Sequence, residues 1–132
     1  MSIHCLIVDD NPAFLEAARA FLERDGLTVS GLATNGAEAV QQADALRPDV
    51  ILVDITLGQE SGLDLARRLA EDGVGERATV ILISTRSEEE VAELAAESPA
   101  AGYLPKAELS ADAIRRLADG RADEGASGRP ET

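Results

Sequence analysis

The sequence has no tryptophan, one tyrosine and two phenylalanines, and it carries a single cysteine, Cys5. A lone cysteine cannot form an internal disulfide, so we expect a reducing compartment, the cytoplasm. No apolar run approaches the roughly 18 residues that a membrane-spanning helix needs. The first four residues lead into a predicted strand without the charged and apolar regions of a signal peptide. These absences argue against a secreted or membrane-embedded protein.

Basic residues are also scarce, because 12 Lys and Arg stand against 25 Asp and Glu, for a net charge of −13. Nucleic acid phosphates attract clustered positive charge, so we expect no direct nucleic-acid binding by this chain. Cations and basic protein surfaces fit its charge better. With 132 residues, 45% of them hydrophobic, the chain is long enough to bury one core.

Strand-like and helix-like patterns alternate along the chain. Apolar runs predict strands over residues 3–8, 27–32, 50–54, 79–84 and 101–104. Apolar residues at helical spacing follow each run, with start signals such as Asn11 before Pro12 and Asn35 three residues before Glu38. Short right-handed crossovers then predict an α/β fold. We expect a flavodoxin-like, doubly wound (βα)5 three-layer sandwich with a parallel sheet in the order 2-1-3-4-5.

The end of the sequence has a different composition. From Gly120 to Thr132 it contains glycine, proline and charged residues but no sizeable apolar side chain. We therefore expect one domain over residues 1–120 and a disordered C-terminal tail over residues 121–132. The last predicted helix is capped by Ser110 and has an apolar face that could mediate a homodimer.

Polar side chains stand at the ends of four predicted strands. Asp9 and Asp10 follow the first, Asp54 ends the third, Ser84 ends the fourth, and Lys106 follows the fifth. Because the carboxyl ends of parallel strands lie along one edge of a sheet, we expect these side chains to converge.

Three gathered carboxylates need positive charge, since two like charges 4 Å apart repel by about 4 kcal/mol at an effective dielectric near 20. Lys106 supplies one positive charge, and Mg²⁺, which prefers oxygen ligands, would supply two. Asp54, on the central strand, is best placed to attack a phosphoryl group and form an aspartyl phosphate. Asp9 and Asp10 would hold the metal, while Lys106 and the Ser84 hydroxyl would contact phosphoryl oxygens.

Taken together, these residues resemble the response-regulator receiver domains of two-component signalling, over roughly residues 2–120. The acidic pair and the strand-end Asp, Ser and Lys occur at the spacing of that family. The segments Asp-Asp-Asn-Pro and Gly-Tyr-Leu-Pro-Lys look most like the branch that usually carries a helix-turn-helix output domain. We expect a single-domain regulator, free-standing or cut from a longer transcription factor.

The resemblance implies a phosphorylation switch at Asp54. A histidine kinase or a histidine-containing phosphotransfer protein would donate the phosphoryl group. Mg²⁺ would be held by the side chains of Asp9, Asp10 and Asp54 and by the backbone carbonyl of Thr56. No enzymatic activity is expected beyond self-phosphorylation from a donor and self-dephosphorylation.

The resemblance also implies residues that respond to phosphorylation. Ser84 would move toward the phosphate and Tyr103 would swing inward, which changes a surface that binds an unknown downstream protein. Thr56 and Arg86 lie where the family tunes the lifetime of the aspartyl phosphate.

Three departures from the family pattern affect these expectations. Gly58 stands where proline is usual, which predicts a looser loop beside Asp54. Thr85 replaces a smaller residue, and Ala107 replaces the common proline after Lys106, where we assume no cis bond. These changes keep open the alternative of a receiver-like interaction module that acts without phosphorylation.

Two other functions fit the sequence less well. A haloacid-dehalogenase-like phosphatase also uses a strand-end Asp nucleophile, but Asp54-Ile55-Thr56 lacks the second acid of its Asp-x-Asp motif. A flavodoxin would share the fold, but it needs a hydroxyl-rich loop after the first strand and aromatic residues beside the flavin. In this chain Asp9 and Asp10 follow the first strand, and Tyr103 is the only candidate for an aromatic residue beside a flavin.

Overall fold

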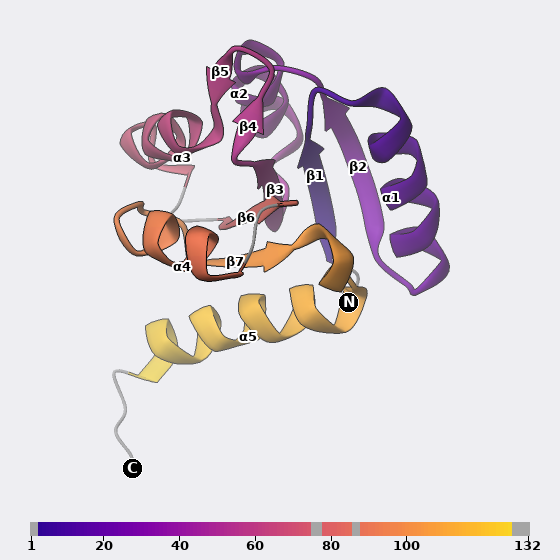
Figure 1. Cartoon of the computed structure of the whole chain (residues 1–132). Coiled ribbons are helices and arrows are strands. Elements are labelled where there is room, and N and C mark those ends of the chain that lie inside the picture. The colour runs from indigo at the N-terminus through magenta and orange to yellow at the C-terminus, as the bar shows by residue number, and fades with distance from the viewer. Residues whose placement is uncertain (1–2, 75–77, 86–87, 128–132) are drawn as a thin grey trace.

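The computed structural model describes residues 3–74, 78–85 and 88–127. Figure 1 shows a central sheet covered by helices on both faces. The elements in chain order are β1 (His4–Val8), α1 (Pro12–Arg24), β2 (Thr28–Ala33), α2 (Gly36–Leu46), β3 (Val50–Asp54), β4 (Thr56–Leu57), β5 (Glu60–Ser61), α3 (Gly62–Glu71), β6 (Thr79–Ser84), α4 (Glu88–Ala96), β7 (Gly102–Pro105), the short 3₁₀ helix η2 (Lys106–Glu108) and α5 (Ala111–Ser127).

The main sheet has five parallel strands in the order β2-β1-β3-β6-β7. With β6 and β7 as the fourth and fifth strands of the sheet, this is the predicted 2-1-3-4-5 order, and the predicted fold class is confirmed. β3 and β6 are buried along their whole length. A strand that is covered on both faces must be apolar on both, which explains the unbroken run Val50–Val53 before Asp54.

Two cores fill the space between the sheet and the helices. On one face, side chains of β1 and β3 such as Leu6 and Ile51 pack with α2 and α3. On the other face, the alternate side chains, such as Ile7 and Leu52, pack with α1 and α5. Cys5 is fully buried in the second core, and burial raises the pKa of its thiol to about 12. The lone cysteine is therefore a core residue and stays protonated at neutral pH.

Helix starts follow the expected capping residues. The Asn11 side chain accepts hydrogen bonds from the N–H groups of Ala13 and Phe14, and Pro12 is the first residue of α1. The Asn35 side chain accepts from Glu38 N–H at the start of α2. The predicted Ser110 cap is also present, since its Oγ accepts from Ala113 N–H at 3.0 Å.

The segment after Asp54 differs from the prediction. Instead of a looser loop, Thr56–Leu57 and Glu60–Ser61 form a two-stranded antiparallel hairpin. Gly58 has a φ of 61° and is the first of the two turn residues, which is where a type II′ hairpin turn requires glycine. Proline, with φ fixed near −65°, could not adopt this conformation. Glycine at position 58, in place of the proline that is usual in the family, therefore allows a hairpin turn.

The last helix is longer than predicted. α5 runs to Ser127, through the first seven residues of the predicted tail 121–132. Alanine, arginine and glutamate, which occur in this segment, have high helix propensity and favour a helical backbone. The disordered tail over residues 121–132 stays a prediction. Residues 128–132 lie outside the described part of the chain, and a domain end at residue 120 stays a prediction.

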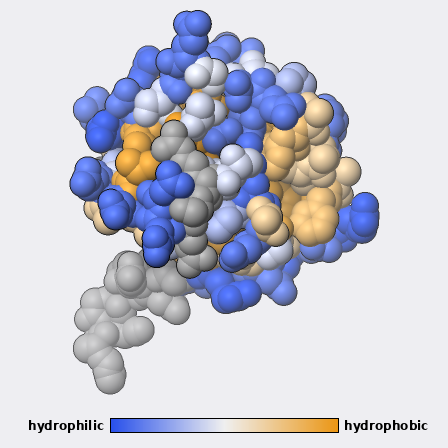
Figure 2. All heavy atoms as spheres, in the orientation of Figure 1, coloured by the Kyte–Doolittle hydropathy of each residue, from blue (hydrophilic) through white to orange (hydrophobic). Residues whose placement is uncertain are grey.

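The surface is mostly hydrophilic in the view of Figure 2, with one group of apolar atoms on the side where Figure 1 places α1 and another on the opposite side. Phe21 of α1 is 41% exposed. Among the described residues, no helix combines the length and the apolar character that crossing a membrane requires.

Candidate functional site

An acidic cluster lies at the carboxyl ends of two adjacent strands. Asp9 and Asp10 directly follow β1, and Asp54 is the last residue of β3. β1 and β3 are hydrogen-bonded neighbours, with Val8 paired to Val53, so the following aspartates emerge side by side. One carboxylate oxygen from each of the three lies within 4.8 Å of the other two. The structure thus brings together the three acids that the strand-end pattern selects.

Lys106 reaches this cluster from the far edge of the sheet. It follows β7, which is separated from β3 by β6. Its Nζ lies 2.6 Å from Asp9 Oδ2 and 3.1 Å from Asp54 Oδ2. The same Nζ is 4.2 Å from the centre of the Phe14 ring, a cation–π contact. Lys106 therefore bridges two of the three carboxylates.

The three acids differ in exposure and in hydrogen bonding. Asp9 is fully buried and Asp54 is 7% exposed, whereas Asp10 is exposed. Asp9 Oδ1 accepts from Asn11 N–H at 2.9 Å, and Asp54 Oδ1 accepts from Thr56 N–H at 3.1 Å. Asp9 Oδ2 is buried beside Lys106 Nζ, but the angles at this ion pair are not those of a hydrogen bond. Asp9 thus keeps an acceptor oxygen aimed into the cluster.

Burial raises the pKa of Asp54, and the charge of Asp9 adds to this effect. Hydrogen bonds from Thr56 N–H and Lys106 oppose it without cancelling it. Burial alone would lower the pKa of Lys106, but Asp9 and Asp54 together raise it. The two shifts have different main causes, since burial disfavours the charged form of Asp54, whereas the two facing carboxylates favour the charged form of Lys106.

The donor set fits a hard divalent cation. Oxygen ligands are what Mg²⁺ prefers, and one or two protein carboxylates suffice because the ion keeps several waters. Three acids and one lysine carry a net charge of −2, which a divalent ion would neutralise. Asp9 Oδ2, which is buried beside Lys106 and forms no hydrogen bond with any described residue, is an oxygen placed to bind the ion. The side chains of Asp9, Asp10 and Asp54 could therefore hold the ion.

The other predicted site residues lie around this cluster. Ser84 is buried at the end of β6, one residue beyond the partner of Asp54 in the β3–β6 ladder. Tyr103, on β7, is half-buried and packs against the core that α2 and α3 cover. Thr56 begins β4 with an exposed side chain and holds Asp54 through its N–H. Arg86 lies outside the described residues.

The sequence pattern does not predict the roles of two residues that lie beside Asp54 and Lys106. Gly62 begins α3, and a Cβ there would overlap the carbonyl oxygen of Asp54, so only glycine lets the helix approach. Its N–H donates to Ile55 O at 2.7 Å, which fixes the backbone next to Asp54. Phe14 fits the apolar pattern of α1, and nothing in that pattern places its ring against Lys106, 92 positions away. Of these two contacts, only the close approach at Gly62 could have been predicted, because a glycine at a helix start can indicate a crowded backbone.

Comparison with known proteins identifies the family. The chain matches the response regulator receiver domain over residues 5–118. It is 37% identical over 119 residues to the nitrate/nitrite response regulator protein NarP of Escherichia coli, covering 87% of this chain and 54% of NarP. The chain spans about half the length of the curated relatives it matches.

Solved structures agree with this match. A two-component response regulator of the LuxR family from Aurantimonas sp. superposes with a TM-score of 0.79 at 28% identity, covering 91% of this chain and 87% of that chain. A response regulator from Burkholderia pseudomallei, solved with a phosphorylated aspartic acid, calcium ion and citrate, gives a TM-score of 0.74 at 28% identity, over 98% of this chain and 76% of that chain. The protein described here belongs to the response regulator receiver domain family of two-component signalling.

Proposed function

We propose that this chain is a phosphorylation-dependent receiver that accepts a phosphoryl group on Asp54 from a histidine kinase or a histidine-containing phosphotransfer protein. The observation that carries the proposal is the convergence of Asp9, Asp10, Asp54 and Lys106 at one sheet edge. Burying a charged cluster of this kind is costly unless its ligand completes it. A divalent cation and a phosphoryl group would do so.

In the proposed reaction, a carboxylate oxygen of Asp54 forms a bond to phosphorus. The bond from phosphorus to the donor's histidine nitrogen breaks, its electron pair returns to the imidazole, and that nitrogen takes up a proton. Lys106, already 3.1 Å from Asp54 Oδ2, lies where positive charge can stabilise the transferring phosphoryl oxygens. Asp9 is placed to keep Lys106 charged and oriented, through the 2.6 Å ion pair.

Asp9, Asp10, Asp54 and the backbone carbonyl of Thr56 would hold Mg²⁺. When bound, the ion would supply the positive charge that the acidic cluster lacks and would shield the phosphoryl oxygens from the carboxylates. The similar response regulator from Burkholderia pseudomallei was solved with a phosphorylated aspartic acid and a calcium ion, which supports an aspartyl phosphate and a divalent ion in this fold.

Ser84 and Tyr103 are the proposed switch residues. The buried Ser84 hydroxyl would donate to a phosphoryl oxygen on Asp54, and Tyr103 would move further into the space beside it. Phosphorylation would stabilise this conformer over the other, and the altered surface would bind a downstream protein or a second copy of the chain. Thr56 and Arg86 would set the lifetime of the aspartyl phosphate. We expect this signalling to take place in the cytoplasm.

Intact-mass measurement tests the proposal. The protein is incubated with acetyl phosphate or phosphoramidate, with Mg²⁺ or with EDTA. We expect one added phosphoryl group with Mg²⁺ and none with EDTA. Asp54→Asn should stay unlabelled, whereas Asp44→Asn, which removes an exposed charge on α2, should label like the wild type.

Two results would contradict the proposal. An unlabelled wild type would favour the phosphorylation-independent interaction module. Labelling of Asp54→Asn equal to that of the wild type would place the acceptor elsewhere.

A further inference from the structure

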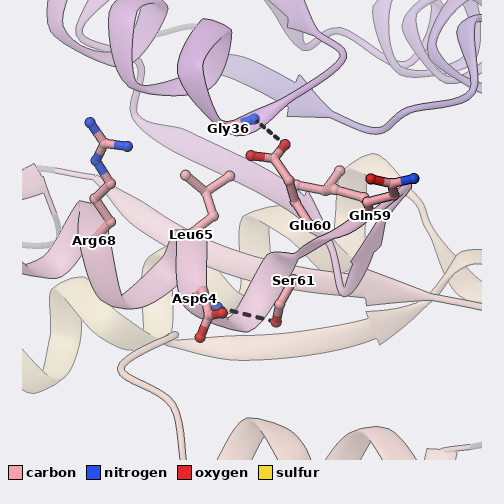
Figure 3. A pocket seen from close by; sticks show the side chains of 8 residues that line it. Gly36, Gln59, Glu60, Ser61, Asp64, Leu65 and Arg68 are labelled. Atoms are coloured by element: carbon pink, nitrogen blue, oxygen red, sulfur yellow. Dashed lines mark hydrogen bonds between the residues drawn. The ribbon is translucent and has the colours of Figure 1, made fainter.

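The β4–β5 hairpin makes a contact that lies outside the acidic cluster. Figure 3 shows Glu60, on β5, pointing toward Gly36, the first residue of α2. Glu60 Oε1 accepts a hydrogen bond from Gly36 N–H at 2.9 Å. This contact joins two segments 24 positions apart.

The contact is favourable for chemical reasons. The first N–H groups of a helix have no partner within the helix, and they carry its positive dipole end. The Asn35 side chain already accepts from Glu38 N–H, and the Glu60 carboxylate accepts from Gly36 N–H. A hydrogen bond from an N–H to a charged carboxylate is stronger than one between neutral groups. A Cβ at Gly36 would lie 3.1 Å from Glu60 Oε2, so glycine there leaves room for the carboxylate.

The same hairpin forms part of the wall of the acidic cluster. Thr56 N–H donates to Asp54 Oδ1 at 3.1 Å, and Thr56 is paired across the hairpin with Ser61. The turn residue Gly58 lies beside Asp10, since a Cβ there would be 3.5 Å from Asp10 Oδ2. The position of the hairpin therefore affects two of the three carboxylates.

A hairpin with two residues per strand is not stable alone and depends on its attachments. Leu57 is buried in the core and anchors β4. On the β5 side, a pocket of about 320 Å³ opens between the hairpin, α2 and α3, with Gly36 and Glu60 among its lining residues. The Glu60 hydrogen bond links β5 to α2 across this space, while Gly62 N–H, which follows β5, is bonded to Ile55 O.

We propose that Glu60 is a positioning residue for the acidic cluster. Its bond to the start of α2 holds the hairpin so that Thr56 N–H stays on Asp54 Oδ1 and the Gly58 turn stays beside Asp10. This inference rests on the proposed function, because it concerns the same acceptor and metal residues. Loss of Glu60 weakens Mg²⁺ binding and slows phosphoryl uptake, although no member of the cluster is changed.

Amide hydrogen exchange and a Mg²⁺ titration followed by NMR test this role on the full chain. In Glu60→Ala we expect the Thr56 amide to exchange about tenfold faster and the Kd for Mg²⁺ to rise by up to the same factor, the order expected for one lost hydrogen bond. Glu60→Gln removes the same charge but keeps an acceptor, so it should restore most of both properties. Gln59→Ala, at the neighbouring exposed turn position, is the matched control and should behave like the wild type.

Three outcomes would overturn the proposal. Unchanged Thr56 exchange and Mg²⁺ affinity in Glu60→Ala would mean that the contact positions nothing. Equal acceleration of β1 and β3 amides would mean that Glu60 acts on global stability only. Equal loss in Glu60→Gln and Glu60→Ala would mean that its charge matters and its hydrogen bond does not. These readouts need no phosphoryl transfer, so a failure of Asp54 to accept phosphate would be seen separately.

Discussion

Replacement of Asp54 by asparagine is expected to make the metal-free protein more stable. The Asp54 carboxylate lies within 4.8 Å of the Asp9 and Asp10 carboxylate oxygens and 3.1 Å from Lys106 Nζ. At an effective dielectric near 20, each repulsion is about 3.5 kcal/mol and the attraction about 5 kcal/mol. The net electrostatic cost of the charge is therefore about 2 kcal/mol. Solvent screening of the exposed Asp10 reduces this cost, and burial of Asp54 adds to it.

Thermal or urea unfolding in EDTA at pH 7 measures this effect. A gain of about 1–2 kcal/mol should raise the Tm of Asp54→Asn by about 3–8 °C in a domain of this size. The introduced amide keeps an acceptor oxygen for Thr56 N–H, but its nitrogen cannot accept from Lys106, so the loss of that hydrogen bond offsets part of the gain. Asp44→Asn should stay within about 0.5 kcal/mol of the wild type, as exposed substitutions do. If Asp54→Asn were less stable than the wild type in EDTA, the reasoning from crowded charge would be refuted.

The pH dependence gives the same prediction a second test. Because burial raises the pKa of Asp54, the Asp54 carboxyl group stays protonated to a higher pH in the folded protein than in the unfolded chain. Its contribution to stability therefore falls as the pH rises from the unfolded pKa of about 3.9 through the raised folded pKa. The asparagine side chain in Asp54→Asn does not titrate. The advantage of the variant should be full at neutral pH and should disappear below the unfolded pKa; an advantage independent of pH would contradict the assignment.

Two further predictions concern the metal and the backbone. Mg²⁺ at 100 times its Kd should stabilise the wild type by about 2.7 kcal/mol, because it binds only the folded cluster. Asp10→Ala should lose most of this gain in Tm, and an intact gain would exclude Asp10 as a ligand. Gly62→Ala should cost about 3 kcal/mol or more in urea unfolding, since its Cβ would overlap the Asp54 carbonyl. Gly73→Ala, with open space around it, should cost about 1 kcal/mol, and equal losses would contradict the overlap.

Much of the fold follows from local patterns. Unbroken apolar runs mark strands that are buried on both faces, and caps such as Asn11 and Asn35 mark helix starts, because both signals depend on residues close together in sequence. The acidic cluster can be inferred as well, since parallel strands place their carboxyl ends on one edge. Asp9, Asp54 and Lys106 are identified in this way.

Other features could not be inferred from local patterns. The β4–β5 hairpin has two residues per strand, which is too short for any periodicity to be seen. The extension of α5 to Ser127 does not follow from the apolar pattern, because residues 121–127 include no sizeable apolar side chain. The contact between Glu60 and Gly36 depends on how two loops meet in space.

The order of the residues by itself determined the α/β class, the sheet order and the identity of the charged residues at the sheet edge, because these depend on periodicity and on the geometry of parallel strands. Only the tertiary structure decided that Asp9 is fully buried while Asp10 is exposed, and that Phe14 lies against Lys106. It also decided that a glutamate on the hairpin attaches the wall of the site to α2. Burial and such contacts depend on distances between distant segments, which are set when helices pack on the sheet.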